Sequence, residues 1–190
     1  MSIVRGVYEG LTAITYSLIL DVVMKVLLLS MGFTDIVYDL LQLITAILWI
    51  GIGMFGWNNI CIIYRGGCRL STIYRYIMFI APTTLAISYI FYLYHDFDAA
   101  ALLFLISISI LLGLSVAGYV GVLMLSNQFR NNLGRVGSVI SIIAVIMWLA
   151  LVPSVMETGT AINAIGNASM VISILQLRKR YVPTRRVSHR

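Results

Sequence analysis

The chain has 190 residues, of which 61% are hydrophobic and 11% are charged. Soluble globular domains carry roughly 25% charged residues, so this composition indicates an integral membrane protein and excludes a typical soluble domain. The formal net charge of +6 comes largely from basic residues grouped in alternate connections between apolar stretches. This pattern is typical of membrane topology, so we do not expect nucleic acid as a partner.

Six apolar stretches are separated by charged or turn-forming residues. They cover about 10–32, 37–63, 74–94, 99–128, 136–156 and 158–177. A hydrocarbon core about 30 Å thick needs about 20 mostly apolar residues per helix, so each stretch is long enough to span a bilayer. We predict an all-α bundle of six transmembrane helices, forming one domain over 1–177, followed by a basic tail over 178–190. Pro153, Glu157 and Gly159 are expected to break the chain between the last two helices.

The basic residues near the ends of the predicted spans, at every second connection, indicate the orientation of the chain. They are Arg5, Arg65, Arg69, Arg75, Arg130 and Arg135, and in the tail Arg178, Lys179, Arg180, Arg185, Arg186 and Arg190. The intervening connections carry acids instead, namely Asp35, Asp39, Asp96, Asp98 and Glu157. Because Lys and Arg near span ends are retained on the cytoplasmic side, we expect both termini in the cytoplasm and the chain in the cell membrane. The tail favours attachment to anionic membrane lipids, with docking onto an acidic partner as the alternative.

Asp21 and Lys25 are charged residues inside the first predicted span, with Asp21 near the middle of the bilayer. Lys25 lies about 6 Å further along the same helical face, so the two side chains can pair. Charges at this depth are costly unless they are paired or hydrated, so the pair is the candidate functional site. The pair fits a proton or ion relay or a substrate contact. It also fits a neutralising structural pair or a contact to the helix of a partner subunit.

Small and polar residues in the even-numbered spans favour helix packing. The candidate packing residues are Gly53, Gly56, Ala117, Gly121, Asn163, Gly166 and Asn167. Small residues allow backbones to approach closely and amides can hydrogen-bond between helices, although a pore lining is the alternative for the two asparagines. The pattern G-x2-[GS]-x8-R occurs three times and ends at Arg65, Arg130 and Arg178. It suggests three parallel two-helix hairpin repeats, but glycine is common in membrane helices and topology already demands each arginine.

The sequence contains no recognisable catalytic or cofactor motif. Its two histidines, His95 and His189, lie outside the predicted spans, which excludes paired intramembrane haem ligands and a Ser-His dyad. An H-E-x-x-H zinc motif and a G-x-x-x-x-G-K-[ST] phosphate-binding loop are also missing. Cys61 and Cys68 are spaced unlike a zinc or redox pair, so we expect two reduced thiols. We therefore expect no cofactor, no metal and no enzymatic activity.

The composition, with much Ile, Leu and Gly, far more Arg than Lys and short loops, resembles that of small uncharacterised multi-pass membrane proteins of thermophilic archaea. That resemblance rests on no motif and implies no activity. The sixth span contains several polar residues, namely Thr160, Asn163, Asn167, Ser169 and Gln176. Such a helix favours protein neighbours, so we expect an accessory or structural subunit of a larger membrane complex, or self-association. The alternative is a small oligomeric transporter or channel that uses Asp21 and Lys25.

Overall fold

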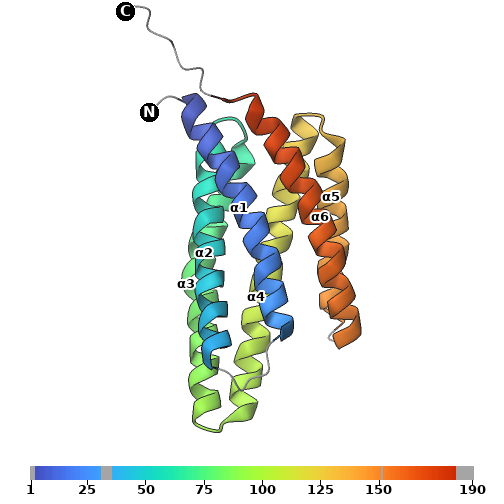
Figure 1. The fold of residues 1–190 in the computed structure, drawn as a ribbon. Coiled ribbons are helices and arrows are strands. Elements are labelled where there is room, and N and C mark those ends of the chain that lie inside the picture. The colour runs from blue at the N-terminus through green and yellow to red at the C-terminus, as the bar shows by residue number, and fades with distance from the viewer. Residues whose placement is uncertain (1–2, 31–35, 151, 183–190) are drawn as a thin grey trace, which may run out of the picture.

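The computed structural model describes residues 3–30, 36–150 and 152–182, with the backbone alone for 36–39. These residues form six helices: α1 (Ile3–Ser30), α2 (Ile36–Ile60), α3 (Arg65–Leu93), α4 (Phe97–Gln128), α5 (Asn132–Trp148) and α6 (Pro153–Lys179). Figure 1 shows the helices running up and down side by side, with the start of α1 and the end of α6 at the same end of the bundle.

The helices have the length and the apolar exterior of a membrane protein. Among the described residues, five helices are long and apolar enough to cross a membrane, and α5 is the shorter sixth. Large apolar side chains cover the outside, since Phe79 is 70% exposed, Ile165 62% and Ile146 61%. Such an exterior is unfavourable in water and favourable in lipid, so the chain is a multi-pass helical membrane protein. With 17 residues, α5 spans about 25 Å, slightly less than the hydrocarbon core.

The connection between the last two helices lies earlier than the sequence indicated. α5 ends at Trp148 and α6 begins at Pro153. Proline is favoured in the first turn of a helix, because the N–H group that it lacks would have no intrahelical partner there. Glu157 and Gly159, which we expected in the connection, therefore lie within α6. The buried Trp148 donates from Nε1 to Thr160 Oγ1 at 3.1 Å, which joins the two helices near this turn.

Local polar groups mark the starts of α4 and α5. Asp96 accepts a hydrogen bond from the Ala99 N–H at 3.2 Å, and Asn131 accepts one from the Gly134 N–H at 3.3 Å. Side chains of this type satisfy N–H groups that the first helical turn leaves without a partner. α3 begins at Arg65, well before the apolar stretch from which we predicted it, because the helix continues through the polar residues at that end of the bundle.

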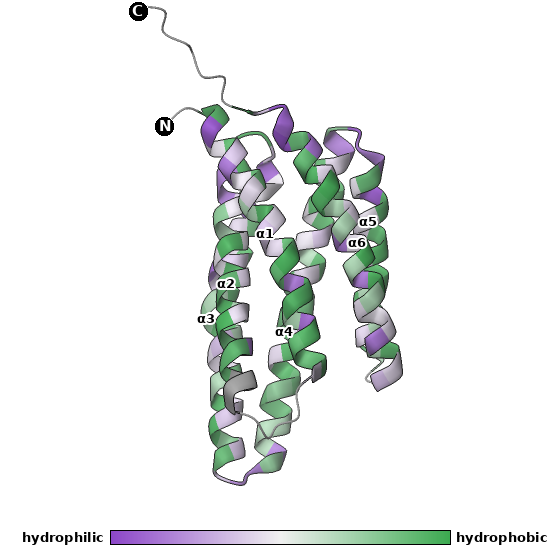
Figure 2. Ribbon diagram, in the orientation of Figure 1, coloured by the Kyte–Doolittle hydropathy of each residue, from purple (hydrophilic) through white to green (hydrophobic). Residues whose placement is uncertain are grey.

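Each helix packs against the next one in the chain, and α1 also packs against α6. The main contacts therefore run once round the bundle and enclose a common interior. The largest side chains buried there include Trp49, Trp57, Tyr119 and Trp148. Figure 2 shows hydrophilic residues at the end of the bundle where α1 begins and α6 ends, and hydrophobic residues along much of the helices.

Glycines bring the two helices of the first and last hairpins into direct contact. A Cβ atom added at Gly56 would lie 2.9 Å from the Ile14 backbone nitrogen of α1. One added at Gly166 would lie 2.8 Å from the Gly137 carbonyl oxygen of α5. Larger side chains at either position would push these backbones apart. Close backbone approach therefore sets the spacing within both hairpins.

Candidate functional site

Asp21 and Lys25 lie one turn apart on α1 and form an ion pair inside the bundle. The Lys25 Nζ atom is 2.6 Å from Asp21 Oδ2. Asp21 is 1% exposed and Lys25 is 0% exposed. Removing each charge from water costs several kcal/mol, which their mutual attraction offsets only when further hydrogen bonds satisfy both groups. Residues of α4 and α6 provide those bonds.

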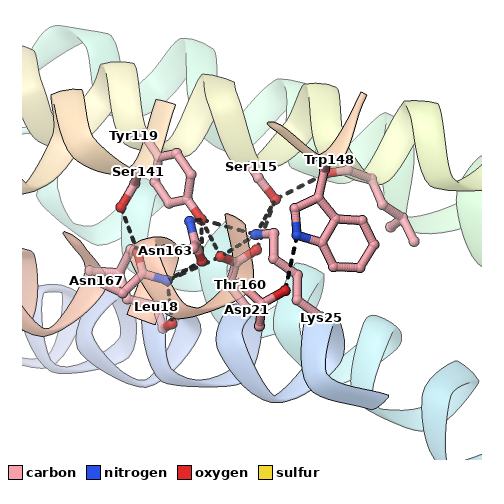
Figure 3. A network of polar contacts seen from close by, with 11 residues as sticks. Leu18, Asp21, Lys25, Ser115, Tyr119, Ser141, Trp148, Thr160, Asn163 and Asn167 are labelled. Atoms are coloured by element: carbon pink, nitrogen blue, oxygen red, sulfur yellow. Dashed lines mark hydrogen bonds and ion pairs between the residues drawn. The ribbon is translucent and has the colours of Figure 1, made fainter. Parts of the chain in front are cut away.

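The Asp21 carboxylate accepts hydrogen bonds from two other helices. Ser115 Oγ of α4 donates to Oδ1 at 2.8 Å. Asn167 Nδ2 of α6 donates to Oδ2 at 3.1 Å, and the Tyr119 hydroxyl of α4 also donates to Oδ2. Figure 3 shows these side chains converging on Asp21. Hydrogen bonds to an ionised carboxylate are roughly twice as strong as neutral ones, so this network compensates much of the cost of burial.

The Lys25 ammonium group has a hydrogen-bond acceptor for each of its three N–H bonds. Besides Asp21 Oδ2, Nζ donates to the Tyr119 hydroxyl oxygen at 3.0 Å and to Ser115 Oγ at 3.4 Å. Nζ also lies 5.4 Å from the centroid of the Tyr119 ring. The ring face is electron-rich and attracts a cation at this distance. The site therefore holds a primary ammonium ion among three oxygen acceptors and one aromatic ring.

Asn163 and Asn167 of α6 extend the same network. Asn163 Nδ2 donates to the Tyr119 hydroxyl oxygen at 2.8 Å, and Asn167 Nδ2 donates to Asn163 Oδ1 at 3.2 Å. Asn167 Nδ2 also lies 3.2 Å from the Leu18 carbonyl oxygen of α1. Ser141 Oγ of α5 donates to Asn167 Oδ1 at 3.4 Å. The two amides therefore take part in the polar centre of the bundle as well as in helix packing.

Three polar pairs with the same spacing build this network. They are Asp21 and Lys25 on α1, Ser115 and Tyr119 on α4, and Asn163 and Asn167 on α6. Residues four apart lie on one face of a helix, so each pair presents two polar groups to the same neighbour. We predicted the first and third pairs from the sequence, but not the second. The only sequence signal for the second pair was the same spacing of four residues. Serine and tyrosine are ordinary residues of membrane helices, so this spacing did not distinguish them.

A small cavity lies beside the Asp21 carboxylate, toward the end of the bundle where α1 begins. The volume open to the centre of a water-sized sphere is about 10 Å³, roughly the minimum for one water molecule. Its wall combines four aromatic side chains with the Asp21 carboxylate and the hydroxyls of two serines. The lining residues include Asp21, Ser17, Trp49, Trp57, Tyr74, Ser115 and Tyr119.

Tyr74 of α3, which lines this cavity, packs against a glycine of α4 and a glycine of α2. A Cβ atom added at Gly118 of α4 would lie 2.7 Å from the Tyr74 hydroxyl oxygen. A Cβ atom added at Gly53 of α2 would overlap the Tyr74 ring. Gly53 and Gly118 are the first glycines of two copies of the G-x2-[GS]-x8-R pattern, and both leave room for this one aromatic side chain. The Tyr74 hydroxyl is directed across the bundle toward α4.

The two predicted packing residues of α4, Gly121 and Ala117, lie in different surroundings. A Cβ atom added at Gly121 would lie 2.8 Å from the Trp57 ring, so this glycine leaves room for an aromatic residue that lines the cavity. Ala117 is half-buried and packs against the apolar core. Trp57 itself is 2% exposed, so it lies inside the bundle.

The basic residues at the end of α6 lie in two different settings. Arg178 Nη1 donates to Thr12 Oγ1 of α1 at 3.2 Å, and its guanidinium lies 5.1 Å from the centroid of the Tyr8 ring. Arg178 therefore ties α6 to α1. Lys179 and Arg180 are exposed at the helix end. The remaining tail residues that we predicted as a lipid or partner surface, Arg185, Arg186 and Arg190, lie outside the described residues.

Cys61 and Cys68 are joined by a disulfide, which contradicts our prediction of two reduced thiols. α2 ends at Ile60 and α3 begins at Arg65, so a tight turn reverses the chain between them. This turn brings the two cysteine Cα atoms to 4.9 Å, within the range that a disulfide requires. The spacing in the sequence could not reveal this proximity, because it depends on where the two helices end.

The described part of the chain holds no cluster of three or more His, Cys, Asp and Glu side chains able to bind a metal ion. The polar groups of the site are one ion pair, the hydroxyls of Ser115, Tyr119 and Ser141, and two amides, beside a cavity that is partly lined by aromatic residues. No known family model, no curated protein and no solved structure matches the chain significantly.

Proposed function

We propose that this protein is a small transporter in which the Asp21–Lys25 pair exchanges a proton with water during each cycle. The observation that carries the proposal is the complete enclosure of this ion pair where α1, α4 and α6 meet. Ionisable residues that face the interior of a membrane bundle commonly mark proton and ion pathways. A small cavity beside the carboxylate supplies a place from which water can reach the pair.

The energetics of buried ion pairs favour a functional role over a structural one. Replacing such a pair by apolar residues of similar volume is often neutral, or stabilising by about 1–4 kcal/mol. A bundle that needed only stability would therefore be served as well by apolar side chains at 21 and 25. The pair adds a group that can change its charge, which apolar side chains cannot do.

Charge neutrality explains how the pair would couple proton movement to transport. In the enclosed state Asp21 is negative and Lys25 is positive, so the site has no net charge. When the bundle opens toward one face, water hydrates the pair, and a proton can leave Lys25 or reach Asp21. Either event leaves a net charge that is costly to enclose again, unless a substrate of the opposite charge enters. Alternating access to the two faces then couples the proton to the substrate.

We further propose that all six helices cross the membrane and that both termini are cytoplasmic. The arginines at 65, 130 and 178 lie at helix ends on the same side of the bundle as the start of α1, which the positive-inside rule assigns to the cytoplasm. The exposed Lys179 and Arg180 would contact anionic lipid headgroups there. The short α5 crosses the membrane if the turn after Trp148 lies in the headgroup region of the bilayer.

An accessory subunit is the less favoured hypothesis, because the polar residues of α6 find protein neighbours within this chain. We expected the polar sixth helix to require protein neighbours. Of the five polar residues behind that expectation, Thr160, Asn163 and Asn167 are buried within this protein, whereas Ser169 is partly exposed and Gln176 is exposed. α6 packs against α1 and α5, and its asparagines reach α4. A partner subunit is therefore not needed to cover the three buried groups.

The proposal can be tested without knowing the substrate. The purified protein is reconstituted into liposomes that are adsorbed on a solid-supported membrane electrode, and the charge displaced by an alkaline pH step is recorded. We expect a transient charge movement in the wild-type protein and its loss in Asp21→Asn and Lys25→Met. Asp98→Asn is the matched control, since Asp98 is an exposed acid in the first turn of α4. Charge movement that persists in folded Asp21→Asn protein would refute the proposal.

A further inference from the structure

The surroundings of Lys25 form a receptor for a primary ammonium ion. Its three N–H bonds meet a carboxylate oxygen, a phenol oxygen and a serine oxygen at 2.6, 3.0 and 3.4 Å. These acceptors come from α1 and α4, so they lie on two different helices. The Lys25 side chain itself is an alkyl chain that ends in an ammonium group. The same acceptors could therefore bind a free alkylammonium ion if the Lys25 ammonium group moved away from them.

The cavity next to this receptor has the chemistry required by the organic part of such a ligand. Trp49, Trp57 and Tyr74 line it, and the rings of tryptophan and tyrosine attract cations and apolar groups alike. The cavity holds no more than about one water molecule. Movement of the Lys25 side chain away from Asp21 would add the volume of a four-carbon ammonium chain. The combined space suits a ligand of similar size.

We propose that the substrate is a small primary alkylammonium ion, which replaces the Lys25 ammonium group on Asp21. This inference rests on the proposed transporter function and names its substrate class. In the exchange, Lys25 loses one proton to water and its neutral amine turns away from the carboxylate. The incoming ammonium group then donates to Asp21, Ser115 and Tyr119. One positive charge leaves as a proton and one enters with the substrate, so the site remains neutral.

Two other kinds of cation fit the site less well. Sodium and potassium ions have no apolar part to place against the aromatic residues that line the cavity beside its oxygen-bearing side chains. A quaternary ammonium ion has no N–H bond, so it would leave the acceptors around Lys25 Nζ without donors, which is costly in a buried site. A primary ammonium ion satisfies the oxygens and can place its alkyl chain against the rings.

The test uses n-butylammonium chloride, whose cation has the same length as the Lys25 side chain. Full-length protein in detergent and weak buffer near neutral pH is titrated with this salt, and proton release is followed with a pH indicator. We expect stoichiometric proton release from the wild-type protein. We expect none from Asp21→Asn, and none when tetramethylammonium or potassium chloride replaces the butylammonium salt.

Binding is measured in parallel through tryptophan fluorescence, since Trp49 and Trp57 line the cavity. Trp148→Phe is the control that keeps the response, because the Trp148 indole hydrogen-bonds to Thr160 and is not among the cavity-lining residues. Lys25→Ala removes the internal competitor, so it should bind butylammonium at least about tenfold more tightly than the wild type. Because Lys25→Ala has no ammonium group to deprotonate, binding of butylammonium to this variant should release no proton.

The outcomes separate this inference from the function on which it rests. A wild-type charge movement after a pH step, without proton release or a fluorescence change on adding butylammonium, would overturn the substrate class and leave the transporter proposal standing. Equal proton release with potassium chloride would also overturn it, in favour of an inorganic cation. If folded wild-type protein showed no charge movement after the pH step, the proposed transporter function would be refuted as well.

Discussion

Burial of the ion pair on α1 predicts how single and double substitutions of Asp21 and Lys25 change the free energy of unfolding. Asp21→Asn leaves the enclosed Lys25 ammonium without a counter-charge, and Lys25→Met leaves the enclosed Asp21 carboxylate in the same position. Removing one partner of a buried pair costs about 3–5 kcal/mol, because the other charge stays uncompensated. The double variant removes both charges. We expect it to be destabilised by less than the sum of the two single changes, with a coupling of about 3 kcal/mol or more.

A matched control lies on the same helix. Arg5 and Glu9 also form an i, i+4 pair, with 2.8 Å between Nε and Oε1, but their side chains are 66% and 32% exposed. An exposed pair of this kind contributes only about 0.2–1 kcal/mol. The same cycle of Arg5→Met and Glu9→Gln should therefore give a coupling several-fold smaller than that of the buried pair. The difference between the two cycles isolates the effect of burial.

The free energies of unfolding would be measured by denaturant titration in detergent micelles with fluorescence detection. Each variant must first show native-like helix content by circular dichroism. Additive effects of the two substitutions at 21 and 25 would refute the reasoning, because additivity would mean that the charges do not interact in the folded protein. A double variant that is more stable than the wild type would agree with it, since apolar replacements of buried pairs can be stabilising.

Three further predictions follow from the packing and the topology. Tyr119→Phe keeps the ring but removes the hydroxyl that bonds to Asp21, so it should lower the free energy of unfolding by about 1–3 kcal/mol, and an unchanged unfolding curve would contradict the network. Gly166→Val should destabilise the protein by about 1–3 kcal/mol, because α5 leaves no room for the side chain; Ile165→Val, at an exposed site, is its control. In a background without the native cysteines, a membrane-impermeant maleimide added to intact cells should label Asp98→Cys and spare Arg130→Cys, and the opposite pattern would reverse the proposed orientation.

Much of the architecture could be predicted because it depends on local properties of the chain. Runs of apolar residues indicate membrane helices whatever surrounds them, since the bilayer demands length and hydrophobicity. The pairing of Asp21 with Lys25 could be predicted for the same reason, because helical geometry places residues four apart on one face. The helix boundaries near Arg65 and Pro153 were less accurate, because hydrophobicity does not report helical turns that extend through polar residues.

The partners of the pair could not be predicted from the sequence. Asp21 and Tyr119 are separated by 98 residues, and their contact depends on how α1 and α4 are rotated about their axes. The cavity beside Asp21 has the same origin, since its wall combines side chains from four helices. The Cys61–Cys68 disulfide depends on the tight turn between α2 and α3.

The sequence by itself determined that the chain is a helical membrane protein with one charged pair inside its first span. Only the tertiary structure decided that this pair faces the interior, which hydroxyls and amides satisfy it, and that aromatic rings stand beside it. The physical reason is that hydrophobicity and i, i+4 spacing act within one helix. The rotation and crossing of helices result from the packing of the whole bundle, in which small residues such as Gly56 and Gly166 allow the closest approach.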